Sequence, residues 1–296
     1  MTSGPSDAGP WLLWQQPHVL SFAEMAYRAV PSARTLHTFN ESVHDSADFM
    51  ASFVLTAPIG LAGCRSLGPP VYTCEIESNE GLPANATSNP TFELVYWQHG
   101  FRIAASWRAR LGLPLRADWQ QAAGTLCRPT ARLYAPADAP VYFPYTSSTI
   151  FAPPGYATQL FAAVLSPVSL ADVPVLASTM RQADAELQLS EGAPTLPWCS
   201  DYAMYAMAAG RLGMRDLAAE LLVSPRNRSS TQSRFLPNGH CSNAFLPVYT
   251  PGNGALLAAA AMLLGGGWDD DDGQPLPGVP RDGTWTVKAE GFAKAL

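Results

Sequence analysis

Three glutamates lie close together in one loop of the chain. Glu75, Glu77 and Glu80 fall within residues 71–88, directly ahead of an expected helix. Cleavage of a glycosidic bond needs one carboxylic acid that protonates the leaving oxygen and a second carboxylate that activates water or attacks carbon. A glutamate on a loop walled by Trp and Tyr would have its pKa raised by desolvation, as that acid requires. The alternative is that all three are solvated loop charges, and spacing alone leaves both interpretations open.

A short N-terminal segment combines indoles, amides and an imidazole. It contains Trp11, Trp14, Gln15, Gln16 and His18. Flat aromatic faces stack on the C–H patches of sugar rings, while amides and imidazoles bind hydroxyls. The segment is therefore a candidate sugar-binding wall, with the alternative that its tryptophans tuck it onto the core.

Two further positions carry side chains that could act on a substrate. Asp201 follows Trp198 at the start of an expected helix, where it could be a catalytic base or a cap of the helix N-terminus. His240 lies beside Cys241 in the sequence LPNGHC, and we consider it a hydrogen-bond donor to substrate. A Cys–His nucleophile pair is disfavoured there, because sequence neighbours rarely present both side chains to one site.

The elements that must position these residues are helical. Apolar residues recur at three- and four-residue steps after Ser32, which can cap the helix, and again from Asn89-Pro90 to Gly112, with Asn89 as the expected N-cap. Trp97 lies on the apolar face of the second of these helices and joins the sugar-binding candidates. Strand signals are confined to 284–287. Further helices are expected at 22–29, 117–126, 156–165, 172–189, 199–212, 215–223 and 254–264, which makes about nine in all.

The connections between these helices alternate between short turns and long, Pro/Gly-rich, aromatic loops. Such an arrangement is typical of helical hairpins whose loops build a site at one end. It favours an all-α toroid over a helical-repeat solenoid, since no fixed repeat period is visible. We expect residues 1–10 to be disordered and residues 11–296 to form a single domain.

Composition narrows the class of partner. Hydrophobic residues make up 47% of the 296, charged residues only 14%, and the formal net charge is −6. The chain can therefore bury a core, and it lacks the basic balance of a nucleic-acid-binding protein. The most apolar stretch, 255–264, is too short to span a bilayer, and the N-terminus lacks signal-peptide features. We expect a soluble chain with a small-molecule substrate and no membrane or nucleic-acid partner; compartment and oligomeric state stay open.

Five cysteines show neither CxxC nor zinc-ligand spacing. A Cys64–Cys74 disulfide is one possibility, but reduced, buried thiols are favoured. No metal and no cofactor is predicted.

Taken together, several motifs resemble those of a known group. WQQPH, DSADFMASF, the Gly-Pro-Pro loop, NPTFELVYW, LPNGH, PGNG and DGTWTV occur in the same order in six-hairpin glycosidase-like proteins. These are similar to the catalytic domain of family 65 glycoside hydrolases and phosphorylases. The resemblance runs from about Trp11 to Glu290, and it implies an (α/α)6 barrel that inverts glycosidic bonds.

The resemblance also implies roles for individual residues. The general acid falls on the glutamate loop, with Glu80 favoured and Glu77 as the alternate, and Asp201 is the best-placed base. Glu93, one turn into the next helix, could face the cavity, but a structural role is favoured for it. A complete barrel has twelve helices, so about nine would be an incomplete toroid, the C-terminal portion of a larger catalytic domain.

The sequence thus predicts a carbohydrate-active protein, an inverting glycoside hydrolase. The alternatives are an inactive glycan-binding relative or truncated remnant, and a helical-repeat interaction scaffold.

Overall fold

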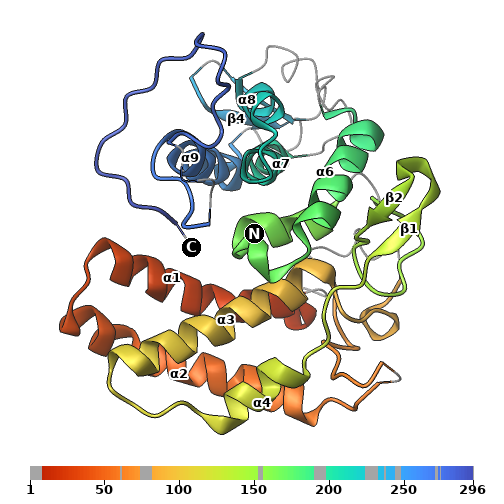
Figure 1. The fold of residues 1–296 in the computed structure, drawn as a ribbon, viewed down its shortest axis with the longest axis vertical. Coiled ribbons are helices and arrows are strands. Elements are labelled where there is room, and N and C mark those ends of the chain that lie inside the picture. Colours follow the sequence, from red (N-terminus) through yellow and green to blue (C-terminus); the bar gives the residue numbers. More distant parts are fainter. Residues whose placement is uncertain are drawn as a thin grey trace. The chain divides into compact units, whose positions relative to one another are not determined.

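The computed structural model is mainly helical over its described residues (Figure 1). It describes residues 9–60, 62–73, 82–152, 156–189, 198–223, 233–236, 238–243, 248–270, 273 and 275–295. Within these ranges there are nine α-helices and two hairpins of three-residue strands. The predicted all-α class is confirmed, whereas closure of the helices into a toroid stays a prediction.

The chain divides into two compact units, which we describe separately. Unit 1 comprises residues 1–130 and 142–154, and unit 2 comprises residues 131–141 and 155–296. The expectation of one domain over 11–296 stays a prediction. Residues 1–8 lie outside the described ranges, and Gly9–Trp11 forms a short 3-10 turn.

Unit 1 is a bundle of four helices: α1 (Gln16–Ala29), α2 (Ala33–Thr56), α3 (Thr91–Arg110) and α4 (Ala117–Thr125). Helix α3 packs against the other three (Figure 1). Its residues 91–101 are all buried, so it is the central element of the unit. The core includes Leu20, Val43, Met50, Trp97, Phe101, Trp107 and Trp119.

Local signals fix most helix ends in unit 1. The Ser32 side chain accepts a hydrogen bond from the Thr35 amide at 3.1 Å, which confirms it as the cap of α2. Gly112 adopts φ 68° just after α3, as the expected helix stop. The predicted N-cap role of Asn89 is wrong: Asn89 has φ 55° and its side-chain oxygen accepts the Leu67 amide at 2.9 Å, in a contact between two loops.

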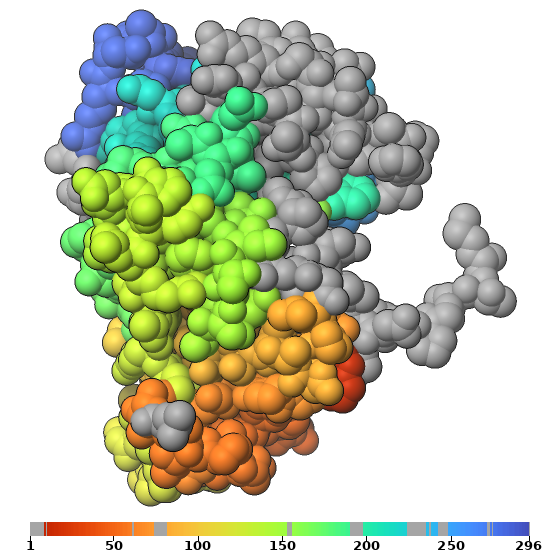
Figure 2. All heavy atoms as spheres, turned by 90° about the vertical axis from the view of Figure 1, so that its right-hand side faces the viewer, coloured from red at the N-terminus to blue at the C-terminus, as the bar shows by residue number. Residues whose placement is uncertain are grey.

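A further segment of unit 1, residues 142–152, runs along the start of α3. The Thr91 amide donates to Pro144 O at 2.8 Å, and the Thr91 hydroxyl donates to Phe143 O at 2.6 Å. The Thr146 amide donates to Ser88 O at 3.3 Å, so the amber stretch before α3 and this yellow-green stretch lie side by side in Figure 2.

Unit 2 contains α5 (Ala162–Leu165), α6 (Val173–Leu187), α7 (Cys199–Arg211), α8 (Arg215–Val223) and α9 (Thr250–Leu264). Helix α7 packs against both α8 and α9. It approaches α9 closely at Gly210, where an added Cβ would lie 2.3 Å from a methyl group of Leu263. Gly213 takes φ 79° in the tight turn between α7 and α8, as expected.

The strand prediction at 284–287 is wrong. Those residues form no strand, because alternation alone does not supply a partner ladder. The two antiparallel hairpins lie elsewhere: β1 (Arg132–Tyr134) pairs with β2 (Ala139–Val141), and β3 (Ser233–Phe235) pairs with β4 (Cys241–Asn243). Strands of three residues are too short to give a periodic signal.

The expectation of reduced thiols is also wrong. Cys64 is bonded to Cys127 in unit 1, and Cys199 is bonded to Cys241 in unit 2. Cys74, the partner considered for Cys64, lies outside the described ranges. The observed partners are 63 and 42 positions apart, and their Cα atoms approach to 4.9 and 5.9 Å only because the chain folds back on itself.

Among the helices of the described ranges, none combines the length and hydropathy needed to cross a bilayer.

Candidate functional site

Hydrogen bonds join the two segments that flank the glutamates, residues 67–73 and 82–89, just before α3. We call these two segments the stem. The Val71 amide donates to Ala84 O at 2.9 Å, and the Asn89 amide donates to Leu67 O at 2.8 Å. The buried Thr87 hydroxyl donates to Val71 O. Glu75, Glu77 and Glu80 themselves lie outside the described residues. The stem nevertheless fixes the two points between which their loop must run.

The N-terminal segment lies against the same stem. The Tyr72 amide donates to Trp11 O at 3.0 Å, so Trp11 adjoins the strand of the stem that enters the glutamate loop. The Trp11 side chain is 39% exposed. Two stretches that the sequence singled out separately, the indole segment and the glutamate loop, are thus brought together.

Three aromatic rings form a row that begins in the 3-10 turn Leu13–Gln15 and continues along α1. Trp14, His18 and Phe22 follow at four-residue steps, and the His18 ring lies 4.9 Å from Trp14 and 5.4 Å from Phe22, centre to centre. Phe22 is 63% exposed, and Trp14 and His18 are half-buried. The buried Trp14 indole N–H has no hydrogen-bond partner in the described part of the chain. This row provides ring faces and an unused donor.

A hydrogen-bond chain links His18 to α3. Its Nδ1 lies 2.6 Å from the Tyr96 hydroxyl, which also lies 3.0 Å from Ser21 Oγ. Nδ1 accepts from Tyr96 when the Ser21 hydroxyl donates to the phenol oxygen, and it donates to Tyr96 in the other tautomer, so Nε2 of a neutral His18 takes the opposite role in each case. Burial lowers the pKa of His18 and raises the pKa of Tyr96, so both groups are neutral at neutral pH.

Glu93 is the most unusual carboxyl group of the described residues. Its side chain is completely buried, and neither carboxyl oxygen has a hydrogen-bond partner among the residues that the structure describes. Burial raises the pKa of Glu93 well above the usual value. A glutamic acid in this environment holds its proton at a pH where an exposed one has lost it.

Helical geometry places Glu93 beside the aromatic row. Tyr96 and Trp97 follow Glu93 by three and four positions, so the three share one face of α3. That face meets the N-terminal segment, because Tyr96 contacts His18 and the Trp97 indole donates to Leu13 O at 3.1 Å. Glu93 therefore lies one turn closer to the stem, on the side of α3 that faces α1. We call Glu93, Tyr96, His18 and Trp14 the α3 site.

The other residues expected in a sugar-binding wall are dispersed. Gln15 is exposed and Gln16 half-buried at the start of α1, and no interaction in the described residues gives either a special role. Trp97 is fully buried in the core, so its rings offer no face to a sugar and it is not carried into the proposal.

The remaining expected residues lie in unit 2. Asp201 is buried in the first turn of α7, where a carboxylate oxygen accepts the Trp198 amide at 3.1 Å; the N-cap residue is Trp198, so Asp201 holds the helix start from its third position and is not the N-cap itself. His240 is half-buried in the β3–β4 connection, and its amide donates to the Asn238 side chain at 3.0 Å. No distance between these residues and the α3 site is described.

Sequence reasoning assigned Glu93 a structural role because its neighbours are apolar. The available signal was a carboxyl group in the run of apolar and aromatic residues that becomes the buried part of α3. Tyr96 was missed, since nothing local links it to His18. Within the described ranges, no three His, Cys, Asp or Glu side chains form a cluster that could hold a metal ion.

Comparison with known proteins adds no family. No protein-family model matches the chain, and no curated protein matches it. The functional argument therefore depends on the geometry of the α3 site and on the resemblance noted from the motifs.

Proposed function

We propose that this chain is a carbohydrate-active protein, an inverting glycoside hydrolase whose general acid lies at the α3 site. The observation that carries the proposal is the buried carboxyl group of Glu93, which has no hydrogen-bond partner among the described residues and shares a face of α3 with Tyr96, the partner of His18. A general acid must keep its proton near neutral pH until the leaving oxygen takes it, and a raised pKa provides this.

The surroundings of Glu93 supply the other groups that a sugar substrate needs. Trp14 offers an indole face and an N–H with no partner among the described residues, and His18 offers its second ring nitrogen, Nε2. Aromatic faces and neutral donors and acceptors suit a pyranose ring with its hydroxyls. The glutamate loop emerges from the stem beside this site, so Glu80 and Glu77, implied by the resemblance, remain alternative acids.

A second candidate function is glycan binding without turnover. The capping bond of Asp201 favours it, because a carboxylate that holds the Trp198 amide has one oxygen engaged in structure. An inverting reaction needs a second carboxylate with a water molecule beside it.

The two candidates differ in a direct experiment. The full chain is incubated with a panel of α- and β-linked disaccharides, with and without phosphate, and the first anomer released is identified by NMR. Turnover with inversion is expected, and the phosphate arm separates hydrolysis from phosphorolysis. Binding of a disaccharide without any turnover would replace the hydrolase by the glycan-binding function.

The acid is identified with three matched variants. Glu93→Gln should lower kcat by about 10²- to 10⁴-fold while disaccharide binding is retained. Glu80→Gln and Glu77→Gln should stay within about tenfold of the native chain. The reverse pattern, with turnover lost in a loop variant and kept in Glu93→Gln, would move the acid to the loop.

A further inference from the structure

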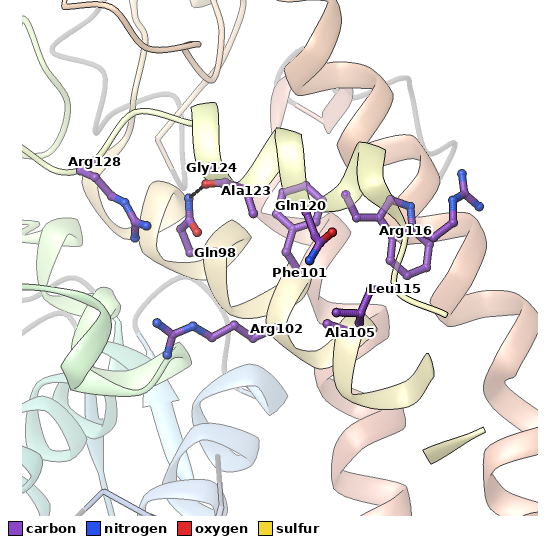
Figure 3. A pocket seen from close by; sticks show the side chains of 11 residues that line it. Gln98, Phe101, Arg102, Ala105, Leu115, Arg116, Gln120, Ala123, Gly124 and Arg128 are labelled. Carbon is purple, nitrogen blue, oxygen red and sulfur yellow. Dashed lines mark hydrogen bonds between the residues drawn. The ribbon is translucent and has the colours of Figure 1, made fainter. Parts of the chain in front are cut away.

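A groove in unit 1 lies between α3 and α4, with a cavity volume of about 320 Å³. This is within the range of small-ligand sites, which starts near 300 Å³. Its lining comes from α3, from α4 and from the residues that flank α4 on either side (Figure 3). These residues are Gln98, Phe101, Arg102, Ala105, Leu115, Arg116, Trp119, Gln120, Ala123, Gly124 and Arg128.

The walls of the groove are held in place by the fold. The Gln98 side-chain amide donates to Ala123 O at 2.8 Å, which ties α3 to α4. The Trp119 indole donates to Asp48 of α2 at 2.7 Å, so α4 is anchored from its other side. Gln98 is buried, and its amide has a fixed orientation in which the carbonyl oxygen is not used by this bond. The groove is therefore preformed.

The charge of the lining is entirely positive. None of the lining residues is acidic, and three are arginines. Arg116 is neutralised by ion pairs with Asp118 at 2.6 Å and Asp48 at 3.0 Å. Arg102 and Arg128 are exposed, and neither has an ion pair or hydrogen bond within the described ranges. Two uncompensated guanidinium groups are notable in a chain with a net charge of −6.

The two uncompensated arginines lie at the opposite end of the groove from Leu115, which has the ion-paired Arg116 beside it (Figure 3). In Figure 3 the side chains of Arg102 and Arg128 extend at the end that carries Gln98, while Leu115 and Ala105 lie toward the other end. An occupant that matches this distribution has an anionic group at one end and a carbon-rich ring at the other. Guanidinium groups bind carboxylates and sulfate esters through paired, charge-assisted hydrogen bonds.

We propose that the α3–α4 groove binds an anionic sugar unit, with Arg102 and Arg128 on its carboxylate or sulfate group and Leu115 and Ala105 against its ring. Gln98 adds an acceptor for a neighbouring hydroxyl. The groove shares no residue with the α3 site, although the choice of a sugar as its occupant rests on the proposed carbohydrate function.

The experiment measures binding to the full chain by calorimetry at low salt. The probes are trigalacturonate, its methyl ester, which keeps the rings and removes the charges, a sulfated disaccharide with its unsulfated parent, and inorganic phosphate. Trigalacturonate or the sulfated disaccharide should bind at least tenfold more tightly than its neutral counterpart, and the pair that shows the difference identifies the anionic group. Rising salt should weaken the binding.

Three variants locate the site. Arg102→Gln and Arg128→Gln should each weaken binding of the anionic sugar about tenfold. Arg34→Gln, which removes an exposed arginine of α2 outside the groove, should leave binding unchanged. Glu93→Gln should also leave it unchanged, so that failure of the hydrolase proposal and failure of this one are distinguishable.

The proposal is overturned by any of three results. These are equal affinity for charged and neutral sugars, native affinity in both groove variants while their melting temperatures are unchanged, or phosphate binding as tight as that of the anionic sugars. The last result would mean that the groove recognises charge alone.

Discussion

Replacing Glu93 by glutamine should stabilise the protein, and by an amount that grows with pH. The native Glu93 carboxyl is fully buried and has no hydrogen-bond partner among the described residues, so its pKa in the folded chain is raised well above the ordinary 4.5 that it has when unfolded. Between these two pKa values the folded state keeps a proton that the unfolded state has released. Stability therefore falls as pH rises through this interval, by about 1.4 kcal/mol for each pH unit.

Glutamine has nearly the same shape and does not ionise, so the variant lacks this loss. Urea unfolding followed by tryptophan fluorescence at pH 4, 5, 6 and 7 gives the free energy of unfolding of both chains. The two should be similar at pH 4, where native Glu93 is protonated in both states. Above the unfolded pKa, the free energy of unfolding of the variant should exceed that of the native chain by about 1.4 kcal/mol more for each pH unit. The difference should stop growing when the pH reaches the folded pKa of Glu93.

An exposed glutamate of the same unit provides the control. Glu41 lies on the solvent face of α2, and Glu41→Gln should not reproduce the rising difference. A difference between native chain and Glu93→Gln that stays constant with pH would refute the reasoning. So would a variant that is less stable than the native chain at pH 7, since Glu93 would then have to be ionised and paired.

Three further changes test the packing of each unit. Glu24→Ala should destabilise unit 1 by about 1–3 kcal/mol in urea unfolding, because it leaves two half-buried arginines and the buried Trp107 indole without their carboxylate. Gly252→Ala should cost about 1–3 kcal/mol in the same assay, because the new Cβ would lie 2.8 Å from the sulfur of Cys241. Cys64→Ser, which opens the Cys64–Cys127 bond, should lower the free energy of unfolding by about 4 kcal/mol, since the bond closes a loop with a sequence separation of 63.

The partners of Glu24 explain its large effect. Arg110 binds both of its carboxylate oxygens, at 2.5 and 2.9 Å, and Arg28 and the Trp107 indole bind at 3.0 and 3.2 Å. Burial alone would raise the pKa of Glu24, but the two arginines lower it on balance. Its contribution is therefore present above the unfolded pKa and is lost as pH falls through the folded one. A Glu24→Ala chain with native stability at pH 7 would contradict this account.

Matched controls exist for the other two changes. Gly254 is two positions from Gly252 on α9, and an added Cβ there meets nothing within 4 Å. Gly254→Ala should therefore be neutral or stabilise by up to about 1 kcal/mol, and an equal loss for both glycines would remove the packing argument. For the disulfide, a reducing agent should lower the free energy of unfolding of the native chain more than that of Cys64→Ser. The variant has no Cys64–Cys127 bond left to reduce.

Elements whose signals are local could be predicted from the sequence. The cap at Ser32, the helix stop at Gly112 and the helix 215–223 all appear where expected. Each depends on residues within about four positions, because helical hydrogen bonds and capping bonds join near neighbours. The predicted cap of α3 is wrong because the Asn89 side chain takes part in a long-range contact. It accepts the amide of Leu67, 22 positions away, and does not bond to the start of the helix.

The sequence by itself determined that the chain is all-α and that indoles, an imidazole and several carboxyls lie in the candidate segments. Only the tertiary structure decided which of these meet. His18 and Tyr96 are 78 positions apart, and the disulfide partners are 63 and 42 positions apart. The burial that keeps Glu93 protonated and the approach of α3 to α4 that forms the arginine groove are likewise properties of packed helices. Such contacts form when the apolar faces of helices that long loops connect pack against one another. No pattern of neighbouring residues specifies which faces will meet.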